Sequence, residues 1–148
     1  MMTMYRFKSA LGIVFFITVL LINQQFSYYV VHGDSMLNSY HEGQLVFVNK
    51  WADPSNFDVI VSHFQDTFII KRVIGVPGDC VAIRHNHLYL NGKLVDEKYV
   101  TLDHSMDDME IDVPEENYFV MGDNRDVSLD SRDFGTIDRS MIVGVSLQ

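Results

Sequence analysis

The chain has 148 residues, 47% of them hydrophobic, with 20 acidic and 11 basic residues that give a formal net charge of −9. This length allows one domain and a short extra segment, and this hydrophobic content argues against disorder. Because an acidic surface repels nucleic acid, we expect no DNA or RNA partner.

The N-terminal segment has no Asp, Glu, Lys or Arg over 9–33, and residues 11–22 are almost continuously apolar. About 20 helical residues are enough to cross the core of a bilayer. We therefore expect a transmembrane signal anchor at 9–31, although the polar run at 23–25 leaves its outer end open. A cleaved signal peptide is the alternative, but no small-x-small cleavage site follows Ile22.

The orientation of this anchor follows from the two basic residues, Arg6 and Lys8, that precede it. Positive charge favours the cytoplasmic side of a membrane, so residues 1–8 are expected to be cytoplasmic. Residues 32–148 then form an extracytoplasmic domain, and the protein is a single-pass protein of the cell membrane.

The extracytoplasmic part shows the short apolar runs and turn residues of a β domain. Asn91-Gly92 supplies the positive φ angles of a tight hairpin turn. We expect a mainly β fold, built as a folded-over antiparallel sheet or a partly open barrel. The predicted strands are 44–49, 57–62, 67–76, 81–84, 88–90, 93–95, 118–121 and 141–145.

Three features of the sequence could indicate a calcium loop, a histidine metal site or a functional cysteine. The acidic stretch 103–116 lacks the spacing of an EF-hand calcium loop, so we interpret it as a solvated connecting loop. His85-Asn86-His87 has no nearby third ligand and is interpreted as a turn, so no metal is expected. Cys80 is the only cysteine, which excludes an intrachain disulfide, and we expect a small buried apolar residue there.

Lys71 is the most unusual charged residue of the predicted strands, because apolar side chains surround it in the run from Phe68 to Ile74. Burial disfavours the ammonium ion and lowers a lysine pKa by up to about 3–5 units. A neutral amine can accept the proton of a serine hydroxyl, which is a poor nucleophile without a base. The alternative is a lysine that reaches solvent or pairs with an acid.

Three stretches behind the anchor decide between these alternatives. They are Gly33-Asp34-Ser35-Met36, then Lys71-Arg72-Val73-Ile74-Gly75, and then residues 122–135, which begin Gly-Asp-Asn-Arg. In this order the chain resembles the bacterial type I signal peptidases, and their short Gram-positive form in particular. The resemblance implies a serine endopeptidase with a Ser/Lys dyad, without cofactor or metal, that removes signal peptides from exported preproteins.

The resemblance also assigns roles by position. Ser35 is the expected nucleophile, Lys71 the general base, and Ser128 the residue that orients the lysine through a hydrogen bond. The Ser35 N–H is expected in the oxyanion hole, and Gly33 stands where some relatives supply a serine hydroxyl to it. The expected structural ion pairs involve Arg72, Asp123, Asp130 and Arg132.

The family cleaves after small residues at the first and third positions before the scissile bond. An extended substrate would lie beside the strand before Lys71 and the segment before Ser35. Alignment places the pocket residues at Val31, Met36, Tyr40 and Ile70.

The chain departs from the family pattern Ser-Met-x-Pro-Thr-Leu, because it has Asn38-Ser39-Tyr40 at the last three positions. Asn38 lacks the fixed φ of proline, and Tyr40 is bulkier than leucine, so the turn could be looser or the pocket narrower. Both dyad residues are present, and we expect an active enzyme.

Two other functions compete with this one. The first is a self-cleaving Ser/Lys peptidase of the SOS-repressor type, which the anchor and the acidic surface disfavour. The second is a non-catalytic or weakly active membrane-anchored relative that binds exported chains, and the altered 37–40 segment is its only support.

Overall fold

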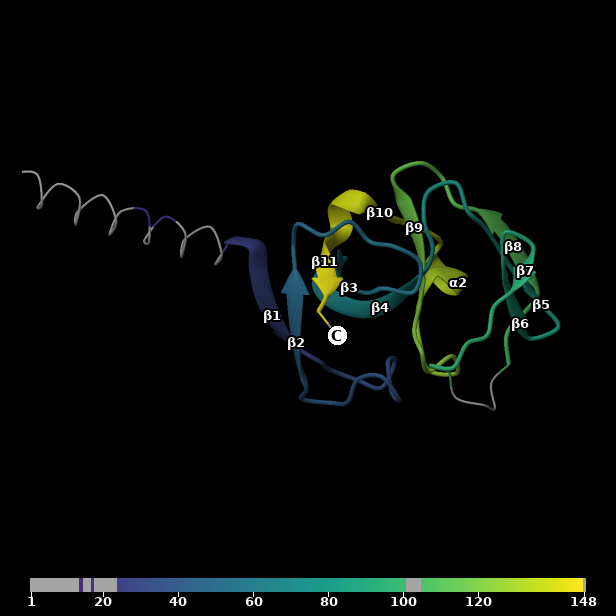
Figure 1. Ribbon diagram of the computed structural model, residues 1–148. Coiled ribbons are helices and arrows are strands. Elements are labelled where there is room, and N and C mark those ends of the chain that lie inside the picture. The colour runs from purple at the N-terminus through teal and green to yellow at the C-terminus, as the bar shows by residue number, and fades with distance from the viewer. Residues whose placement is uncertain (1–13, 15–16, 18–23, 101–104, 148) are drawn as a thin grey trace, which may run out of the picture.

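The computed structural model describes residues 14, 17, 24–100 and 105–147. Two antiparallel sheets dominate this part of the chain, at opposite sides of the view in Figure 1. The larger sheet lies on the left of that view and the smaller one on the right, with the short helix α2 (Ser131–Phe134) between them.

The larger sheet has seven strands in the order β1-β2-β11-β3-β4-β9-β10, and each pair of neighbours is antiparallel. Its order is linear, so it does not close into a barrel within the described residues. Its strands are β1 (Phe26–Val30), β2 (Leu45–Asn49), β3 (Val59–Phe64), β4 (Thr67–Gly75), β9 (Asn117–Met121), β10 (Ile137–Asp138) and β11 (Ile142–Ser146).

The smaller sheet has the strand order β7-β6-β5-β8. The predicted hairpin is present between β6 and β7, where Asn91 and Gly92 have φ angles of 52° and 75°. Its strands are β5 (Cys80–Arg84), β6 (His87–Leu90), β7 (Lys93–Leu94) and β8 (Met109–Asp112). The remaining elements are α2 (Ser131–Phe134) and the 3₁₀ turn η1 (Arg139–Met141).

The core explains why β3 and β4 form the centre of the larger sheet. Val59 and Val61 pack on one side of β3, and Ile60 packs in a different cluster on the other. Because both faces of β3 are covered, its apolar run is continuous and does not alternate. A third cluster joins Ile74 and Phe119 of the larger sheet to β5 and β6 of the smaller one.

The expected outer boundary of the anchor, at Val31, is wrong. Residues 26–30 form β1, which pairs with β2 from Phe26↔Asn49 to Val30↔Leu45. The N–H of Val31 continues this pairing with the carbonyl of Gln44. The run Phe-Ser-Tyr-Tyr-Val alternates between exposed and half-buried side chains, as a half-covered strand does.

Most of the expected anchor, including residues 9–13 and 18–23, lies outside the described residues, as do residues 1–8. Within the part that the structure describes, no helix combines the length and the apolar character needed to cross a membrane.

Two smaller expectations also change. The acidic stretch 103–116 is not only a loop, because Met109–Asp112 alternates apolar and acidic side chains and pairs with β5 as β8. Cys80 is half-buried at the start of β5 and not fully buried. Burial and a hydrogen bond with Asp112 raise the pKa of its thiol.

The sequence His85-Asn86-His87 forms the turn that the pattern predicted. His85 and Asn86 have positive φ angles of 50° and 66° and connect β5 to β6. The ring of His87 hydrogen-bonds the carbonyl of His85.

Candidate active site

Ser35 lies in a tight turn between β1 and β2. Gly33 opens this turn with a φ of +82°, a conformation that glycine adopts without steric cost. The N–H of Leu37 donates to Asp34 O, and those of Ser39 and Tyr40 donate to Met36 O. Met36 is buried beneath the turn, so packing and backbone hydrogen bonds together fix the position of Ser35.

Lys71 reaches this turn from β4, where it pairs with Ile60 of β3. Its side chain is buried, and a hydrogen bond of 2.7 Å joins Lys71 Nζ to Ser35 Oγ. Burial lowers the pKa of Lys71 to about 8, against the opposing effect of the carboxylates of Asp130 and Asp123; the charge of Arg132 lowers it further. The lysine and serine of the expected dyad are therefore in contact, and the amine loses its proton easily.

The segment 122–135 holds the turn of Ser35 from the other side. The backbone N–H of Asn124 donates to Ser35 O at 3.0 Å, and its side chain donates to Asp34 O at 3.1 Å. Gly122 lies so close that a Cβ on it would stand 2.4 Å from Ser35 O and 2.2 Å from Ser128 Oγ. Only glycine fits there, because the two backbone segments meet without an intervening side chain.

The expected ion pairs are present. Arg72 donates to Asp123 through Nε at 2.8 Å and Nη2 at 2.6 Å, and Arg132 Nε donates to Asp130 at 2.8 Å. Asp130 also caps α2 and accepts the N–H of Gly122 at 2.9 Å. Burial raises the pKa of Asp130, but the hydrogen bond and charge of Arg132 outweigh it, so the pKa is below its usual value.

Two expected site residues, Ser128 and Gly33, form contacts that differ from the prediction. Ser128 Oγ is buried, and the expected bond to Lys71 is not formed; its hydroxyl acts on Asp130 instead and helps to lower the pKa of that carboxyl. The Lys71 amine is directed at Ser35 instead. The N–H of Gly33 donates to Glu42 Oε2, and His32 Nδ1 is 3.0 Å from Glu42 Oε1.

Two grooves meet at Ser35 and Lys71. The first has a volume of about 270 Å³ and runs between the end of β1 and β4, with Val31 and Ile70 among its lining residues. The second, about 440 Å³, opens on the same two residues and is bordered by the exposed side chains of Val127 and Leu129. A chain lying across the dyad therefore has space on both sides.

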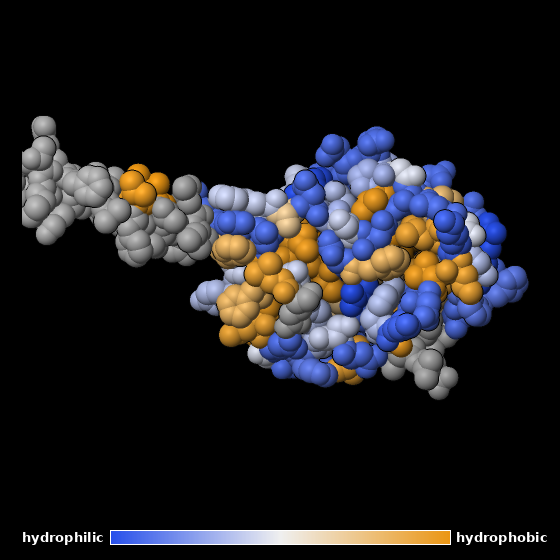
Figure 2. All heavy atoms as spheres, in the orientation of Figure 1, coloured by the Kyte–Doolittle hydropathy of each residue, from blue (hydrophilic) through white to orange (hydrophobic). Residues whose placement is uncertain are grey.

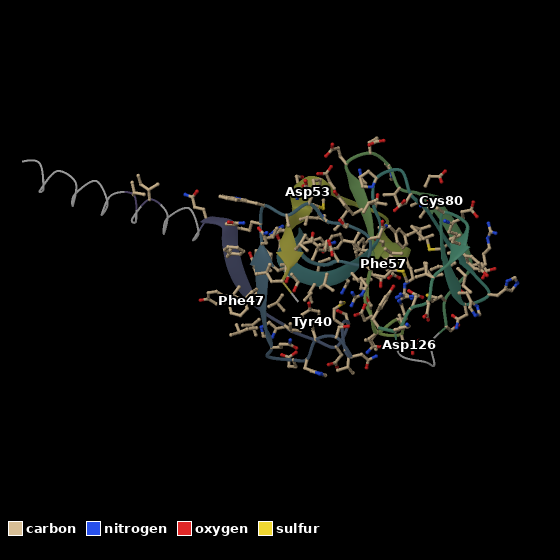
Figure 3. All side chains as sticks on the ribbon, viewed as in Figure 1. Tyr40, Phe47, Asp53, Phe57, Cys80 and Asp126 are labelled. Carbon is tan, nitrogen blue, oxygen red and sulfur yellow. The ribbon has the colours of Figure 1, made fainter. Side chains whose placement is uncertain are left out.

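Met36 and Tyr40 do not line either groove, in contrast to the expectation. Both are buried in the cluster beneath the turn. Tyr40 is larger than the leucine of the family pattern, and its hydroxyl has a polar partner in this cluster: it lies 2.9 Å from the Oγ of Ser146 on β11. Figure 3 labels Tyr40, which lies below the larger sheet in that view.

A family model described as signal peptidase, peptidase S26, matches residues 3–147. This chain belongs to the signal peptidase family. Signal peptidase I S of Bacillus subtilis (strain 168) is 38% identical over 157 residues, covering 95% of this chain and 85% of the relative. Signal peptidase I of Bacillus caldolyticus is 40% identical over 138 residues, covering 80% of this chain and 76% of the relative.

The fold agrees with this assignment. The crystal structure of a signal peptidase I from Enterococcus faecalis V583 superimposes with a TM-score of 0.58 at 34% identity. The match covers 64% of this chain and 97% of that one. The chain is thus an enzyme of the signal peptidase I type with a mainly β, antiparallel domain.

Ser39 is a site residue of this signal peptidase that the sequence analysis missed. Its hydroxyl donates to Asp123 Oδ2 and accepts from Arg72 Nη2 at 3.1 Å. The sequence contains a signal for this role, because Ser39 keeps a hydroxyl where the family pattern has threonine. This hydroxyl ties the turn of Ser35 to the ion pair beside Lys71.

Asn38 explains why this signal peptidase lacks the usual proline. Its φ is +95°, whereas a proline ring holds φ near −65°. We expect Asn38→Pro to lower the free energy of unfolding by more than about 1 kcal/mol, and Asn38→Gly to be tolerated. Thermal unfolding of both variants is the measurement, and an Asn38→Pro protein as stable as wild type would contradict this turn geometry.

Proposed function

We propose that the protein is a membrane-bound serine endopeptidase that removes N-terminal signal peptides from exported preproteins, with Ser35 as nucleophile and Lys71 as general base. The observation that carries this proposal is the 2.7 Å contact between Lys71 Nζ and Ser35 Oγ at the junction of two grooves. The buried position of Lys71 supports it, because only a neutral amine can take the serine proton.

The proposed reaction has two stages. In the first, Lys71 Nζ accepts the Ser35 proton, Ser35 Oγ attacks the scissile carbonyl, and Lys71 returns the proton to the leaving amine. In the second, Lys71 takes a proton from water, which attacks the resulting ester; the ester bond breaks, the signal peptide leaves, and Lys71 passes the proton to Ser35 Oγ. The Ser35 N–H is the proposed oxyanion donor, a contribution worth a few kcal/mol in such sites.

Ser128 retains a proposed role in the second stage. Its hydroxyl is buried, forms no bond to Lys71 in this structure, and lies near the backbone of Gly122 next to Ser35 O. Once Ser35 is acylated, its Oγ is a poorer partner for the lysine. We assign Ser128 the task of accepting a hydrogen bond from Lys71 at that point.

The proposed substrate is an extended segment with small residues at the first and third positions before the scissile bond. Support comes from the first groove, whose walls include Val31 and Ile70 on either side of the dyad. A strand added beside β4 would form backbone hydrogen bonds independent of sequence, with small pockets providing selection.

Membrane attachment is also proposed, with residues 1–8 in the cytoplasm and the sheets outside. The span must end before Phe26, because β1 begins there. Apolar side chains exposed on β1 and β2 support a position against the bilayer: Tyr28, Val30, Leu45 and Phe47. Figure 2 shows apolar atoms gathered over this end of the domain, and Figure 3 places Phe47 there.

The proposal predicts a pH dependence. Below pH 8 the lysine is protonated and cannot act as a base, since its pKa is about 8. We expect kcat/KM to rise about tenfold per pH unit at lower pH and to level off above the pKa. A kcat/KM profile that stays flat from mildly acidic to alkaline pH would argue against Lys71 as the base.

The direct test is cleavage of a preprotein by the full chain in phospholipid vesicles. Wild type, Ser35→Ala and Lys71→Ala are compared, with the new N-terminus of the product sequenced. The proposed enzyme releases the mature chain, whereas neither variant does. If wild type cuts no better than the variants, the protein is a non-catalytic relative that binds exported chains.

A further inference from the structure

A buried ion pair connects the segment after the smaller sheet to the loop that carries Asp123 and Asp130. The side chain of Arg125 is completely buried and forms an ion pair with Glu97, whose side chain is only 11% exposed. Glu97 belongs to residues 95–100, which follow β7. Breaking one partner of a buried pair leaves an uncompensated charge, so this contact strongly constrains both segments.

Through Arg125, Glu97 constrains the backbone that contacts Ser35. Arg125 Nε donates to Gly122 O at 3.1 Å, and Arg132 donates to the carbonyl of Arg125 at 2.8 Å. Gly122 in turn donates its N–H to Asp130. Arg125 therefore fixes Gly122 at one end of this loop, and Arg132 at the other end fixes the backbone of Arg125.

A second arm starts from the same carboxylate. The hydroxyl of Tyr99 donates to Glu97 Oε1 at 3.1 Å, and the guanidinium of Arg72 lies 4.2 Å from the centre of the Tyr99 ring. This geometry is a cation–π contact. Arg72 directly follows Lys71 on β4 and pairs with Asp123. This second arm therefore connects Glu97 to the residue next to Lys71.

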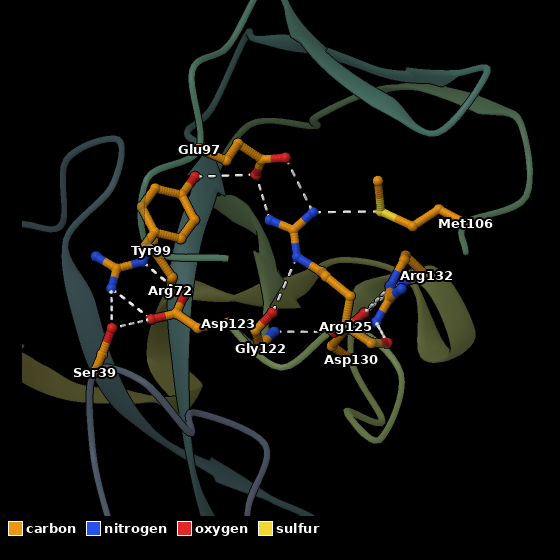
Figure 4. A network of polar contacts seen from close by, with 10 residues as sticks. All are labelled: Ser39, Arg72, Glu97, Tyr99, Met106, Gly122, Asp123, Arg125, Asp130 and Arg132. Carbon is orange, nitrogen blue, oxygen red and sulfur yellow. Dashed lines mark hydrogen bonds and ion pairs between the residues drawn. The ribbon is translucent and has the colours of Figure 1, made fainter. Parts of the chain in front are cut away.

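Figure 4 shows that the two arms meet at Glu97, with Arg125 on one side and Tyr99 on the other. We propose that Glu97 and Tyr99 are positioning residues for the Ser35–Lys71 pair, and that the smaller sheet acts on the site through them. The proposal rests on the proposed function of that pair. Neither residue touches the reacting atoms; they keep the loop 122–132 closed against Lys71.

The consequence for the reaction follows from the burial of Lys71. Desolvation is the largest cause of its low pKa and outweighs the opposing charges of Asp130 and Asp123 on the same loop, where the charge of Arg132 also lowers it. An opening of the loop that admits water while these charges stay near should therefore raise that pKa. Loosening either arm should therefore reduce kcat and move the pH profile to higher pH. Substrate binding in the first groove should change little, because neither residue lines it.

The experiment uses the full chain in detergent and a synthetic peptide with alanine at the first and third positions before the scissile bond. Four variants are compared with wild type: Glu97→Gln, Tyr99→Leu, Tyr99→Phe and Asp96→Asn. Asp96 is the matched control, since it is an exposed neighbour whose ion pair within the described residues is with exposed Lys98. Tyr99→Phe keeps the ring over Arg72 and loses only the hydroxyl.

For Glu97→Gln and Tyr99→Leu we expect kcat to fall about tenfold, KM to stay within about twofold, and the midpoint of the pH profile to rise by about half a unit or more. Tyr99→Phe should lose less than Tyr99→Leu, and Asp96→Asn should match wild type. Circular dichroism measures the folded fraction, and the Tyr99 pair decides the question if Glu97→Gln does not fold.

The proposal is overturned if kcat falls only in proportion to the folded fraction while the pH midpoint stays in place. It is also overturned if the variants match Asp96→Asn. In both cases the wild type remains active, so the proposed function stands. An inactive wild type would overturn the proposed function together with the positioning roles.

Discussion

Replacing Lys71 with methionine should lower kcat by about 10³-fold or more while leaving the domain folded. General-base catalysis contributes about 10² to 10⁴ to a rate, and within the described part of the chain Lys71 is the one base in contact with the Ser35 hydroxyl. Methionine is apolar and of similar length, so it fills the buried space of the lysine stem. The free energy of unfolding should not fall, because a desolvated amine is removed.

The matched control is Lys93→Met, which changes an exposed lysine on β7 far from the dyad. It should cleave the alanine peptide as fast as wild type. The measurement is kcat for both variants together with thermal unfolding. A Lys71→Met enzyme within tenfold of wild type would remove Lys71 from the proposed reaction.

Gly122→Ala is the second variant with a large expected effect. The new Cβ would lie 2.2 Å from Ser128 Oγ, 2.5 Å from Ser128 Cβ and 2.4 Å from Ser35 O. No side-chain rotation relieves the contact with a backbone oxygen, so the turn of Ser35 must move. Since a displacement of about 1 Å can cost 10²-fold in rate, we expect kcat to fall about 100-fold. Overpacking should also lower the free energy of unfolding by about 1–3 kcal/mol.

Gly78→Ala separates the loss of activity from the loss of stability. Gly78 has a φ of +85° and open space around its Cα, far from any crowding. Alanine there should cost about 1 kcal/mol of stability through backbone strain alone and leave kcat unchanged. Wild-type kcat in Gly122→Ala would mean that the loop does not fix the position of Ser35.

Most of the strands could be predicted because their signals are local. β3 and β4 are apolar runs separated by turn residues, and Asn91-Gly92 is a strong hairpin pattern. β1 could not be separated from the apolar segment before it, because no charged residue occurs until Asp34. Its identity as a strand depends on pairing with β2, about 20 residues later, and a local pattern carries no information on that partner.

The site shows the same division. The family pattern led to Ser35, Lys71 and the partner of Arg72, and the structure brings these residues together. It did not lead to Glu97, which lies 28 residues from Arg125 in the chain and becomes a partner only through the fold.

The sequence also did not reveal which side chains of the Ser35 turn are buried. Met36 and Tyr40 follow Ser35 closely and were expected in the pocket, yet both point into the core beneath it. Which face of a short turn is buried depends on the sheet packed against it. The hydroxyl of Tyr40 is satisfied by Ser146, near the opposite end of the chain.

The central claim is that the hydroxyl of Ser35 attacks the substrate and carries the acyl group. The most direct measurement is mass spectrometry of the enzyme after turnover of the alanine peptide is stopped with acid. We predict an ester-linked adduct on the proteolytic fragment that contains Ser35, absent from Ser35→Ala. An adduct on another residue, or undiminished cleavage by Ser35→Ala, would contradict the account.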